Sequence, residues 1–163
     1  MAISLVRIDD RLIHGQIIQG WLKGIDIDII AVASDIVVKD LMWQTLMSIS
    51  VPVSVELKVD SVSNIADAII CGDFENKRTM ILASSPRDIL FMLKKGARFA
   101  SINVGGMHHT QGKKEILFNI YADDGDINDL KEISQMGIEL EGRLLPGDDK
   151  TDVVSFIKKY EKK

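Results

Sequence analysis

The chain contains very little cysteine and proline and has no long apolar run. Its single cysteine, Cys71, cannot form an intramolecular disulfide or a thiolate metal cluster, and we expect it to be a small buried side chain. The three prolines among 163 residues leave no proline-rich linker. The longest apolar stretches, such as residues 25–33, contain or adjoin an acid and are far shorter than the roughly 20 residues that cross a bilayer.

A targeting segment and a dominant charge are missing as well. Residues 1–5 lead directly into a strand-like run without the basic segment, apolar core and cleavage site of a secretory signal, so we expect a cytoplasmic protein. The formal net charge is −4, and the basic residues are interspersed with acids, which argues against a nucleic-acid partner. The length and the 46% hydrophobic content predict one compact domain over residues 1–163.

Apolar, β-rich runs alternate with segments of helical periodicity along the whole chain. We expect strands over residues 3–8, 27–33, 51–59, 79–83, 100–104, 115–122 and 139–145. We expect helices over residues 15–24, 41–49, 65–70, 85–96, 127–136 and 151–160. This alternation predicts an α/β fold with an open, mostly parallel central sheet of about seven strands and helices on both faces.

Polar or glycine-rich segments follow three of the predicted strands, at residues 9–16, 34–35 and 103–112. In open α/β sheets, functional sites lie beyond the carboxyl ends of the strands. These three segments are therefore the candidate parts of a site.

The first of these segments carries the residues that a phosphohistidine needs. Gly15 leaves room for another molecule to approach the ring of His14. Backbone N–H groups at the start of the following helix, together with the guanidinium of Arg11, can bind an anion on that ring. Asp9 or Asp10 can hold one ring nitrogen, which fixes the tautomer and leaves the other nitrogen free to attack.

Structural interpretations of the same residues stay open at this point. A histidine between a strand and a helix is commonly a satisfied polar residue, and arginine–aspartate pairs near a turn commonly hold the loop. The segment Asn103–Gly106 lacks both the G-x-G-x-x-G and the G-K-[ST] patterns of nucleotide-binding loops. We expect it to pack closely against the His14 loop instead.

Two further groups of residues have a structural and a functional interpretation. His108 and His109 lack the additional ligands that a metal site requires, so we expect surface loop residues, with a contact of His108 to a phosphate or a partner left open. Met42, Trp43, Leu46 and Met47 are apolar at helical spacing. We expect them to belong to the core, and an exposed subunit contact is the alternative.

Residues 7–16, Arg-Ile-Asp-Asp-Arg-Leu-Ile-His-Gly-Gln, followed by Trp21, resemble the N-terminal signature of the mannose/fructose/sorbose family of IIB subunits of bacterial sugar phosphotransferase systems. The resemblance extends along the chain through Ile102–Met107, Lys113-Lys114 and Leu145-Pro146. Ser34-Asp35 stands where the family usually has Asn-Asp. This departure puts in doubt any contact that the asparagine amide would make.

The resemblance implies a phosphocarrier in which His14 is phosphorylated on Nδ1 by a phosphorylated IIA subunit or domain. The group then passes to a sugar held by the membrane subunits IIC and IID, with which the chain would associate peripherally. No metal, nucleotide or other cofactor is implied, and a homodimer is compatible with relatives. Arg11 would neutralise the phosphoryl oxygens, and Asp10 would orient the loop or the ring. The other positions expected at the phosphate or the partner are Asp9, Gly15, Gln16, Ser34, Asp35, Gly105, Gly106 and His108.

Two other functions compete with the phosphocarrier. A regulatory module that has lost transfer would be expected to lose the nucleophile, yet Arg11, His14 and Gln16 are intact. A nucleotide- or metal-dependent α/β enzyme would need phosphate-loop or ligand spacings that the sequence lacks. The sugar is left open among mannose, fructose, sorbose and amino sugars such as N-acetylgalactosamine.

Overall fold

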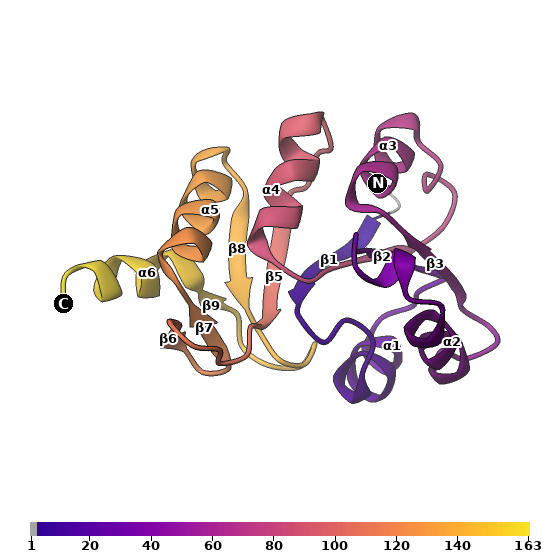
Figure 1. Ribbon diagram of the computed structural model, residues 1–163, viewed down its shortest axis with the longest axis horizontal. Coiled ribbons are helices and arrows are strands. Elements are labelled where there is room, and N and C mark those ends of the chain that lie inside the picture. Colours follow the sequence, from indigo (N-terminus) through magenta and orange to yellow (C-terminus); the bar gives the residue numbers. More distant parts are fainter. Residues whose placement is uncertain (1–2) are drawn as a thin grey trace.

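The computed structural model describes residues 3–163. Residues 1–2, part of the segment in which we expect no secretory signal, lie outside the described residues. Seven strands form one sheet in the order β3-β2-β4-β1-β5-β8-β9 (Figure 1). The first six pair in parallel, and β9 is antiparallel to β8. The strands are β1 (Ile3–Asp9), β2 (Ile29–Ala33), β3 (Glu56–Asp60), β4 (Thr79–Ala83), β5 (Ser101–Gly106), β8 (Glu139–Gly142) and β9 (Thr151–Asp152). The predicted mostly parallel sheet is confirmed.

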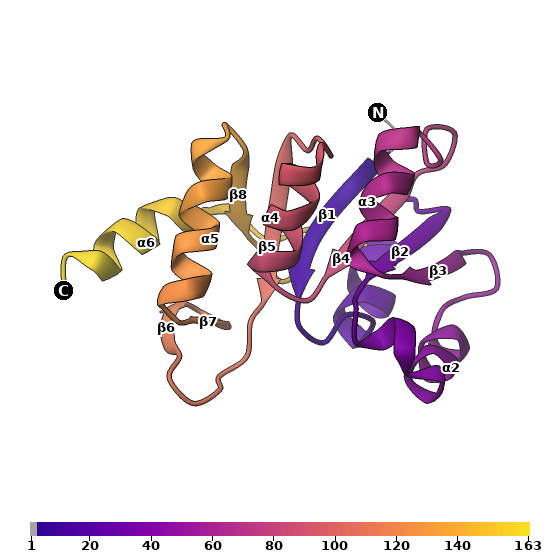
Figure 2. The ribbon, with the colours of Figure 1, turned by 45° about the horizontal axis from the view of Figure 1, so that its top comes forward.

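Helices cover both faces of this sheet, as predicted. One face carries η1 (Gln16–Trp21), α1 (Leu22–Gly24), η2 (Val37–Lys39) and α2 (Leu41–Ser50). The other carries α3 (Val62–Cys71), α4 (Pro86–Lys95), α5 (Asp124–Gln135) and α6 (Val153–Glu161), of which α3, α4 and α5 stand side by side in Figure 2. Alternate residues of β4 supply the two cores: Met80 and Leu82 face α2, whereas Ile81 and Ala83 face α3 and α4.

Local signals in the sequence place most helix ends. Ser85 caps α4 by accepting a hydrogen bond from the amide of Asp88, and Pro86 occupies the first helical position. Gly96 ends that helix with a φ of 127°, which favours glycine. Asp123 begins α5 in a reciprocal capping arrangement with Asp126.

Several predicted elements differ from the structure, and the strand predicted over residues 139–145 ends at Gly142. Residues 115–122 form not one strand but a hairpin, β6 (Lys114–Leu117) and β7 (Ile120–Ala122), because Asn119 turns the chain with a φ of 64° that asparagine tolerates. Residues 51–55 form a turn, closed by a hydrogen bond from the amide of Val55 to the carbonyl of Pro52, so β3 begins only at Glu56. The last helix begins at Val153, after the short strand β9 and the cap at Asp152.

Two expectations about burial are wrong. Cys71 is exposed at the end of α3. Because α3 runs back from the carboxyl end of β3, Cys71 lies at the amino edge of the sheet, opposite the His14 loop. In α2, Met47 is buried, but Met42 is 75% and Leu46 is 59% exposed. Within residues 3–163, every helix is too short or too polar to span a membrane.

Candidate active site

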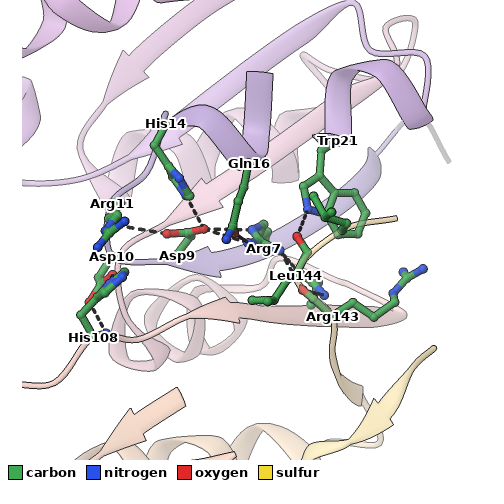
Figure 3. A network of polar contacts seen from close by, with 12 residues as sticks. Arg7, Asp9, Asp10, Arg11, His14, Gln16, Trp21, His108, Arg143 and Leu144 are labelled. Atoms are coloured by element: carbon green, nitrogen blue, oxygen red, sulfur yellow. Dashed lines mark hydrogen bonds and ion pairs between the residues drawn. The ribbon is translucent and has the colours of Figure 1, made fainter. Parts of the chain in front are cut away.

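The loop that follows β1 places His14 at the carboxyl edge of the sheet. β1 lies between β4 and β5, near the middle of the sheet. The amide of Asp10 donates to the carbonyl of Gly106 at 3.1 Å, and the amide of Leu12 donates to the carbonyl of Asp9 at 3.0 Å. Leu12 is buried and has a φ of 57°, a conformation that is uncommon for a residue other than glycine. This turn returns the chain, so that the ring of His14 lies over the end of its own strand (Figure 3).

Asp9 is the centre of the site, and it is buried. Its Oδ2 lies 2.8 Å from Nε2 of His14 and accepts hydrogen bonds from Nε and Nη2 of Arg7 at 3.1 and 2.9 Å. Its Oδ1 accepts the backbone amide of Arg11 at 3.1 Å. The ring of His14 is thus oriented through Nε2. Its Nδ1 has no hydrogen-bond partner within residues 3–163, and 19% of the side chain is exposed.

The charge state of Asp9 follows from these contacts. Burial alone would raise the pKa of Asp9, but the hydrogen bond with His14 and the positive charge of Arg7 outweigh it, so the pKa lies below its ordinary value. Asp9 is therefore ionised at neutral pH. An ionised carboxylate can only accept hydrogen bonds, so Nε2 of His14 carries the proton in this contact.

Arg7 holds Asp9 through Oδ2, the same oxygen that contacts His14. Its side chain is fully buried, and burial lowers the pKa of Arg7 while the neighbouring Asp9 counteracts that change. The guanidinium also donates to Oδ1 of Asn103, to Oε1 of Gln16 at 3.0 Å and to the carbonyl of Arg143 at 3.0 Å. A buried arginine with this many partners has one well-defined position, and it transmits that position to Asp9.

The glycine turn at the end of β5 provides the space for Arg7. In the pairing of β1 with β5, Ile8 is opposite Val104 and Asp9 is opposite Gly106, so Gly105 is an extra residue that forms a bulge. A Cβ atom at Gly105 would lie 1.9 Å from Cζ of Arg7. The expected close packing of this segment against the His14 loop is confirmed.

The segment after His14 is wound more widely than the predicted α-helix. Residues Gln16–Trp21 form a π-helical turn, in which residues five apart come to the same side. Gln16 hydrogen-bonds Arg7, and the indole ring of Trp21 lies 5.4 Å from Cζ of the same guanidinium. In an α-helix, residues five apart would diverge by about 140°, so both could not face Arg7. Nε1 of Trp21 also donates to the carbonyl of Leu144 at 2.8 Å.

Asp10 holds the second histidine rather than the first. Its Oδ2 accepts the backbone amide of His108 at 2.7 Å, and its Oδ1 pairs with Nδ1 of the same residue. Consecutive acids in one loop thus each hold a histidine, and they hold opposite nitrogens of the two rings (Figure 3). Asp9, and not Asp10, therefore orients the ring of His14. Of the two roles expected for Asp10, orienting the ring and positioning the loop, the contacts with His108 fit only the second.

Of the other residues predicted for the site, some face open space, and others hold backbone amides of nearby turns. The side chain of Arg11 is exposed and makes no hydrogen bond or ion pair within residues 3–163, and a Cβ at Gly15 would meet nothing within 4 Å. Ser34 accepts the amide of Val37, and Asp35 accepts the amide of Val62. These two contacts lie in the connections after β2 and β3, which β4 separates from β1.

Sequence reasoning did not assign a role to Arg7 or Asn103, nor to Glu141 and Arg143, which form an ion pair beside them. A signal was present: Arg7 and Asn103 are polar residues inside otherwise apolar strands, where only a partner makes burial tolerable. Among residues 3–163, no three His, Cys, Asp or Glu side chains are grouped in a way that could hold a metal ion.

Comparisons with known proteins agree on one family. The model of the family "PTS system sorbose subfamily IIB component" matches residues 3–163, where PTS denotes the phosphotransferase system. The fructose-specific EIIB component of Bacillus subtilis is 35% identical over 162 residues, which cover 99% of each protein. The mannose-specific EIIAB component of Escherichia coli K12 is also 35% identical, but the chain spans only half the length of that relative.

Solved structures show the same relationship. The crystal structure of the IIBSor domain of the sorbose permease from Klebsiella pneumoniae superposes with a TM-score of 0.91, at 30% identity and 98% coverage of both chains. The resemblance noted around His14 is thereby confirmed as a family relationship. The chain belongs to the sorbose-subfamily IIB components of sugar phosphotransferase systems.

Proposed function

We propose that this chain is a phosphocarrier that accepts a phosphoryl group on Nδ1 of His14 and passes it to a sugar. One observation carries this proposal: the ionised, buried Asp9 lies 2.8 Å from Nε2 of His14. Because Nε2 keeps its proton there, a neutral imidazole has its lone pair on Nδ1. That nitrogen is the nucleophile, and Asp9 stabilises the positive charge that the ring acquires when it is phosphorylated.

The transfer step balances without a cofactor. Nδ1 of His14 attacks the phosphorus of a phosphohistidine on the donor, a new N–P bond forms, and the donor's N–P bond breaks with its electron pair returning to the donor's ring. The bond made and the bond broken are of the same kind, so the exchange is nearly balanced in energy. The work of the site is therefore positioning and charge stabilisation.

Arg11 is the residue that we assign to the phosphoryl oxygens. Its guanidinium is exposed and makes no ion pair within residues 3–163, while its backbone is held by Asp9 beside the His14 ring. His108 is assigned to the donor's surface or to the phosphoryl group, because Asp10 holds its Nδ1 and leaves Nε2 available. The open space at Gly15 admits the donor.

The donor that we propose is a phosphorylated IIA subunit or domain, and the acceptor is a sugar bound by membrane IIC and IID subunits. The relatives support this placement, since one of them is named as an EIIAB component. The protein would work in the cytoplasm at the face of those subunits. Relatives are named for fructose, mannose, sorbose and N-acetylgalactosamine, and we propose that the membrane subunits choose the sugar.

Phosphate incorporation tests the proposal. Labelled phosphoenolpyruvate would be supplied with enzyme I, HPr and a IIA protein, and wild type would be compared with His14→Ala and Cys71→Ser. We expect acid-labile label on wild type and Cys71→Ser, because Cys71 is at the opposite edge of the sheet, and none on His14→Ala. Label retained by His14→Ala would move the acceptor elsewhere, with His108 tested next. No label on any variant, with a competent IIA, would favour a regulatory module.

A further inference from the structure

A row of three polar side chains crosses the sheet at the level of Arg7. The parallel pairing places Arg7 of β1 opposite Asn103 of β5, and Asn103 opposite Glu141 of β8. Residues paired across neighbouring strands point to the same face of a sheet, so the three side chains lie side by side on one face. All three are buried. A buried carboxylate such as that of Glu141 is tolerated only when partners compensate for the lost water.

The first partner of Glu141 is the side-chain amide of Asn103. Nδ2 of Asn103 donates to Oε2 of Glu141 and to the backbone carbonyl of Arg143, both at 3.2 Å. These two oxygens can only accept hydrogen bonds, so they hold the NH₂ group of the amide on their side. Oδ1 of Asn103 is thereby turned toward Arg7 and accepts a hydrogen bond from its Nη1. With the amide reversed, donors would face each other at Arg7.

The second partner of Glu141 is the guanidinium of Arg143. Nη2 and Nε of Arg143 donate to Oε1 and Oε2 of Glu141 at 2.8 and 2.9 Å, a bidentate contact with one well-defined geometry. Cζ of Arg143 lies 5.3 Å from the centre of the Trp21 ring, and Cζ of Arg7 lies 5.4 Å from it (Figure 3). The backbone carbonyl of Arg143 accepts a hydrogen bond from Nη1 of Arg7 at 3.0 Å. Glu141 therefore contacts both residues that hold Nη1 of Arg7.

The position of Nη1 determines how Arg7 meets Asp9. A guanidinium is planar and rigid, so acceptors that fix Nη1 also fix the directions of Nε and Nη2, which bind Asp9. The negative charge of Glu141 acts on Arg7 as well. Burial lowers the pKa of Arg7, and the charges of Asp9 and, more weakly, Glu141 counteract that change.

We propose that Glu141 is a positioning residue for phosphoryl transfer. Through its two partners it fixes Nη1 of Arg7, and Arg7 in turn holds Asp9 in place beside His14. The inference rests on the proposed function, in which His14 accepts the phosphoryl group. The side chain of Glu141 is only 5% exposed, so a docking donor meets little of it. Loss of Glu141 should therefore slow the transfer step and leave the binding of the donor unchanged.

A second buried acid provides a matched control for a purely structural role. Asp129 of α5 is also buried and pairs with an arginine, Arg87, at 2.8 Å, but it packs on the other face of the sheet. Glu141→Leu and Asp129→Leu both remove a buried carboxylate and leave an arginine unpaired. Urea unfolding of each variant gives its loss of stability. If Glu141 only stabilised the fold, transfer in the two variants would follow stability alone.

Rapid-quench measurement of phosphorylation by phospho-IIA, over a range of donor concentrations, tests the proposal. We expect the maximal rate of Glu141→Leu to fall on the order of 10–100-fold, with an unchanged donor concentration for half-maximal rate. Glu141→Gln should transfer faster than Glu141→Leu, because a glutamine oxygen can still accept from Asn103. Asp129→Leu should transfer at the wild-type rate. Equal losses in Glu141→Leu and Asp129→Leu, or a wild-type rate in Glu141→Leu, would overturn the proposal.

The Nε–H signal of Arg7 in a ¹H–¹⁵N NMR spectrum tests the positioning without any transfer. Held by Asp9 and by the partners of Glu141, this proton should exchange slowly with water in wild type and in Asp129→Leu. We expect fast exchange and a lost signal in Glu141→Leu. A wild type that accepts no phosphoryl group would contradict the proposed function, whereas an Arg7 signal unchanged in Glu141→Leu would contradict the positioning itself.

Discussion

Oδ2 of Asp9 lies 2.8 Å from Nε2 of His14, and the same oxygen accepts two hydrogen bonds from the buried Arg7. One carboxylate oxygen therefore links His14, the proposed phosphoryl acceptor, whose side chain is 19% exposed, to a buried cation. The orientation and the tautomer of His14 therefore depend on Asp9 and Arg7, both of which are buried.

Replacing Asp9 by Asn should show whether Asp9 acts by orienting the ring of His14 or only by its negative charge. The amide can present its N–H to Nε2, which favours the wrong tautomer, so we expect transfer to His14 to slow by on the order of 10³–10⁴-fold. Rapid-quench measurement of phosphorylation by phospho-IIA gives the rate, and ¹⁵N NMR of His14 gives the tautomer. Asp10→Asn is the matched control, since it removes the same charge from the same loop but contacts His108. Equal losses in the two variants would contradict this role for Asp9.

The pH dependence of the free energy of unfolding should show that folding lowers the pKa of Asp9. Its folded pKa is below the ordinary value of about 3.9, so its stabilisation is complete above that pH and disappears as the pH falls through the folded pKa. The difference in free energy of unfolding between wild type and Asp9→Asn should stay constant from pH 7 to about 4.5 and shrink at lower pH. Urea unfolding at each pH checks this. A difference that already shrinks near pH 6 would mean that burial dominates and that the pKa is raised.

Gly105→Ala should disturb the site without touching His14. The new Cβ would meet the Arg7 guanidinium at 1.9 Å, so Arg7 must move and Asp9 loses its support. We expect the free energy of unfolding to fall by about 1–3 kcal/mol, and the NMR signals of His14 to shift. Gly147→Ala is the control, because a Cβ there would meet nothing within 4 Å. Unchanged stability and unchanged His14 signals would show that a Cβ at position 105 can be accommodated without moving Arg7, which would contradict this role of Gly105.

Arg11→Ala should slow transfer while the fold is unaffected. Its guanidinium is exposed and has no partner within residues 3–163, so little stability depends on it. Losing one charged donor to the phosphoryl oxygens should reduce the transfer rate by about 10²–10³-fold. Arg98→Ala, an exposed arginine at the opposite edge of the sheet, should transfer at the wild-type rate. A normal rate for Arg11→Ala would remove this residue from the mechanism.

The phosphorylated ring nitrogen can be identified directly. Because Asp9 holds Nε2, the phosphoryl group should be attached to Nδ1. Two-dimensional ¹H–¹⁵N NMR of the phosphorylated protein distinguishes the two ring nitrogens by their chemical shifts and their couplings to ³¹P. Attachment to Nε2 would require the ring to leave Asp9 and would contradict the proposed geometry.

Most of the fold could be predicted from the sequence, because apolar strands and helix caps are local signals. The predicted ends of β4 agree residue by residue with the structure, and Ser85-Pro86 marks the start of α4. The hairpin at Asn119 was missed because a turn of two residues inside an apolar run has a weak signature.

The site was less predictable, because its contacts join distant segments. Sequence alone allowed either Asp9 or Asp10 to hold the ring of His14, and Asp10 was the residue expected to orient the loop or the ring. In the structure Asp9 contacts His14, and the left-handed conformation at Leu12 places the ring there. The wide turn of η1 depends on Arg7, which Gln16 and Trp21 must both reach. The exposure of Met42 and Leu46 could not be predicted, because an apolar helix face can be covered by the chain's own core or by another molecule.

The segment of residues 143–148 has a consequence for synthesis on the ribosome. Arg143 and Leu144 provide carbonyls to Arg7 and Trp21, and the side chains of Leu145 and Pro146 occupy the space beside Gly20 and Gly24. The N-terminal loop that carries His14 is thus completed by residues translated more than a hundred positions later. A nascent chain that stalls before this segment emerges would display His14 without its ordered support, so we expect phosphoryl acceptance to begin only near the end of translation.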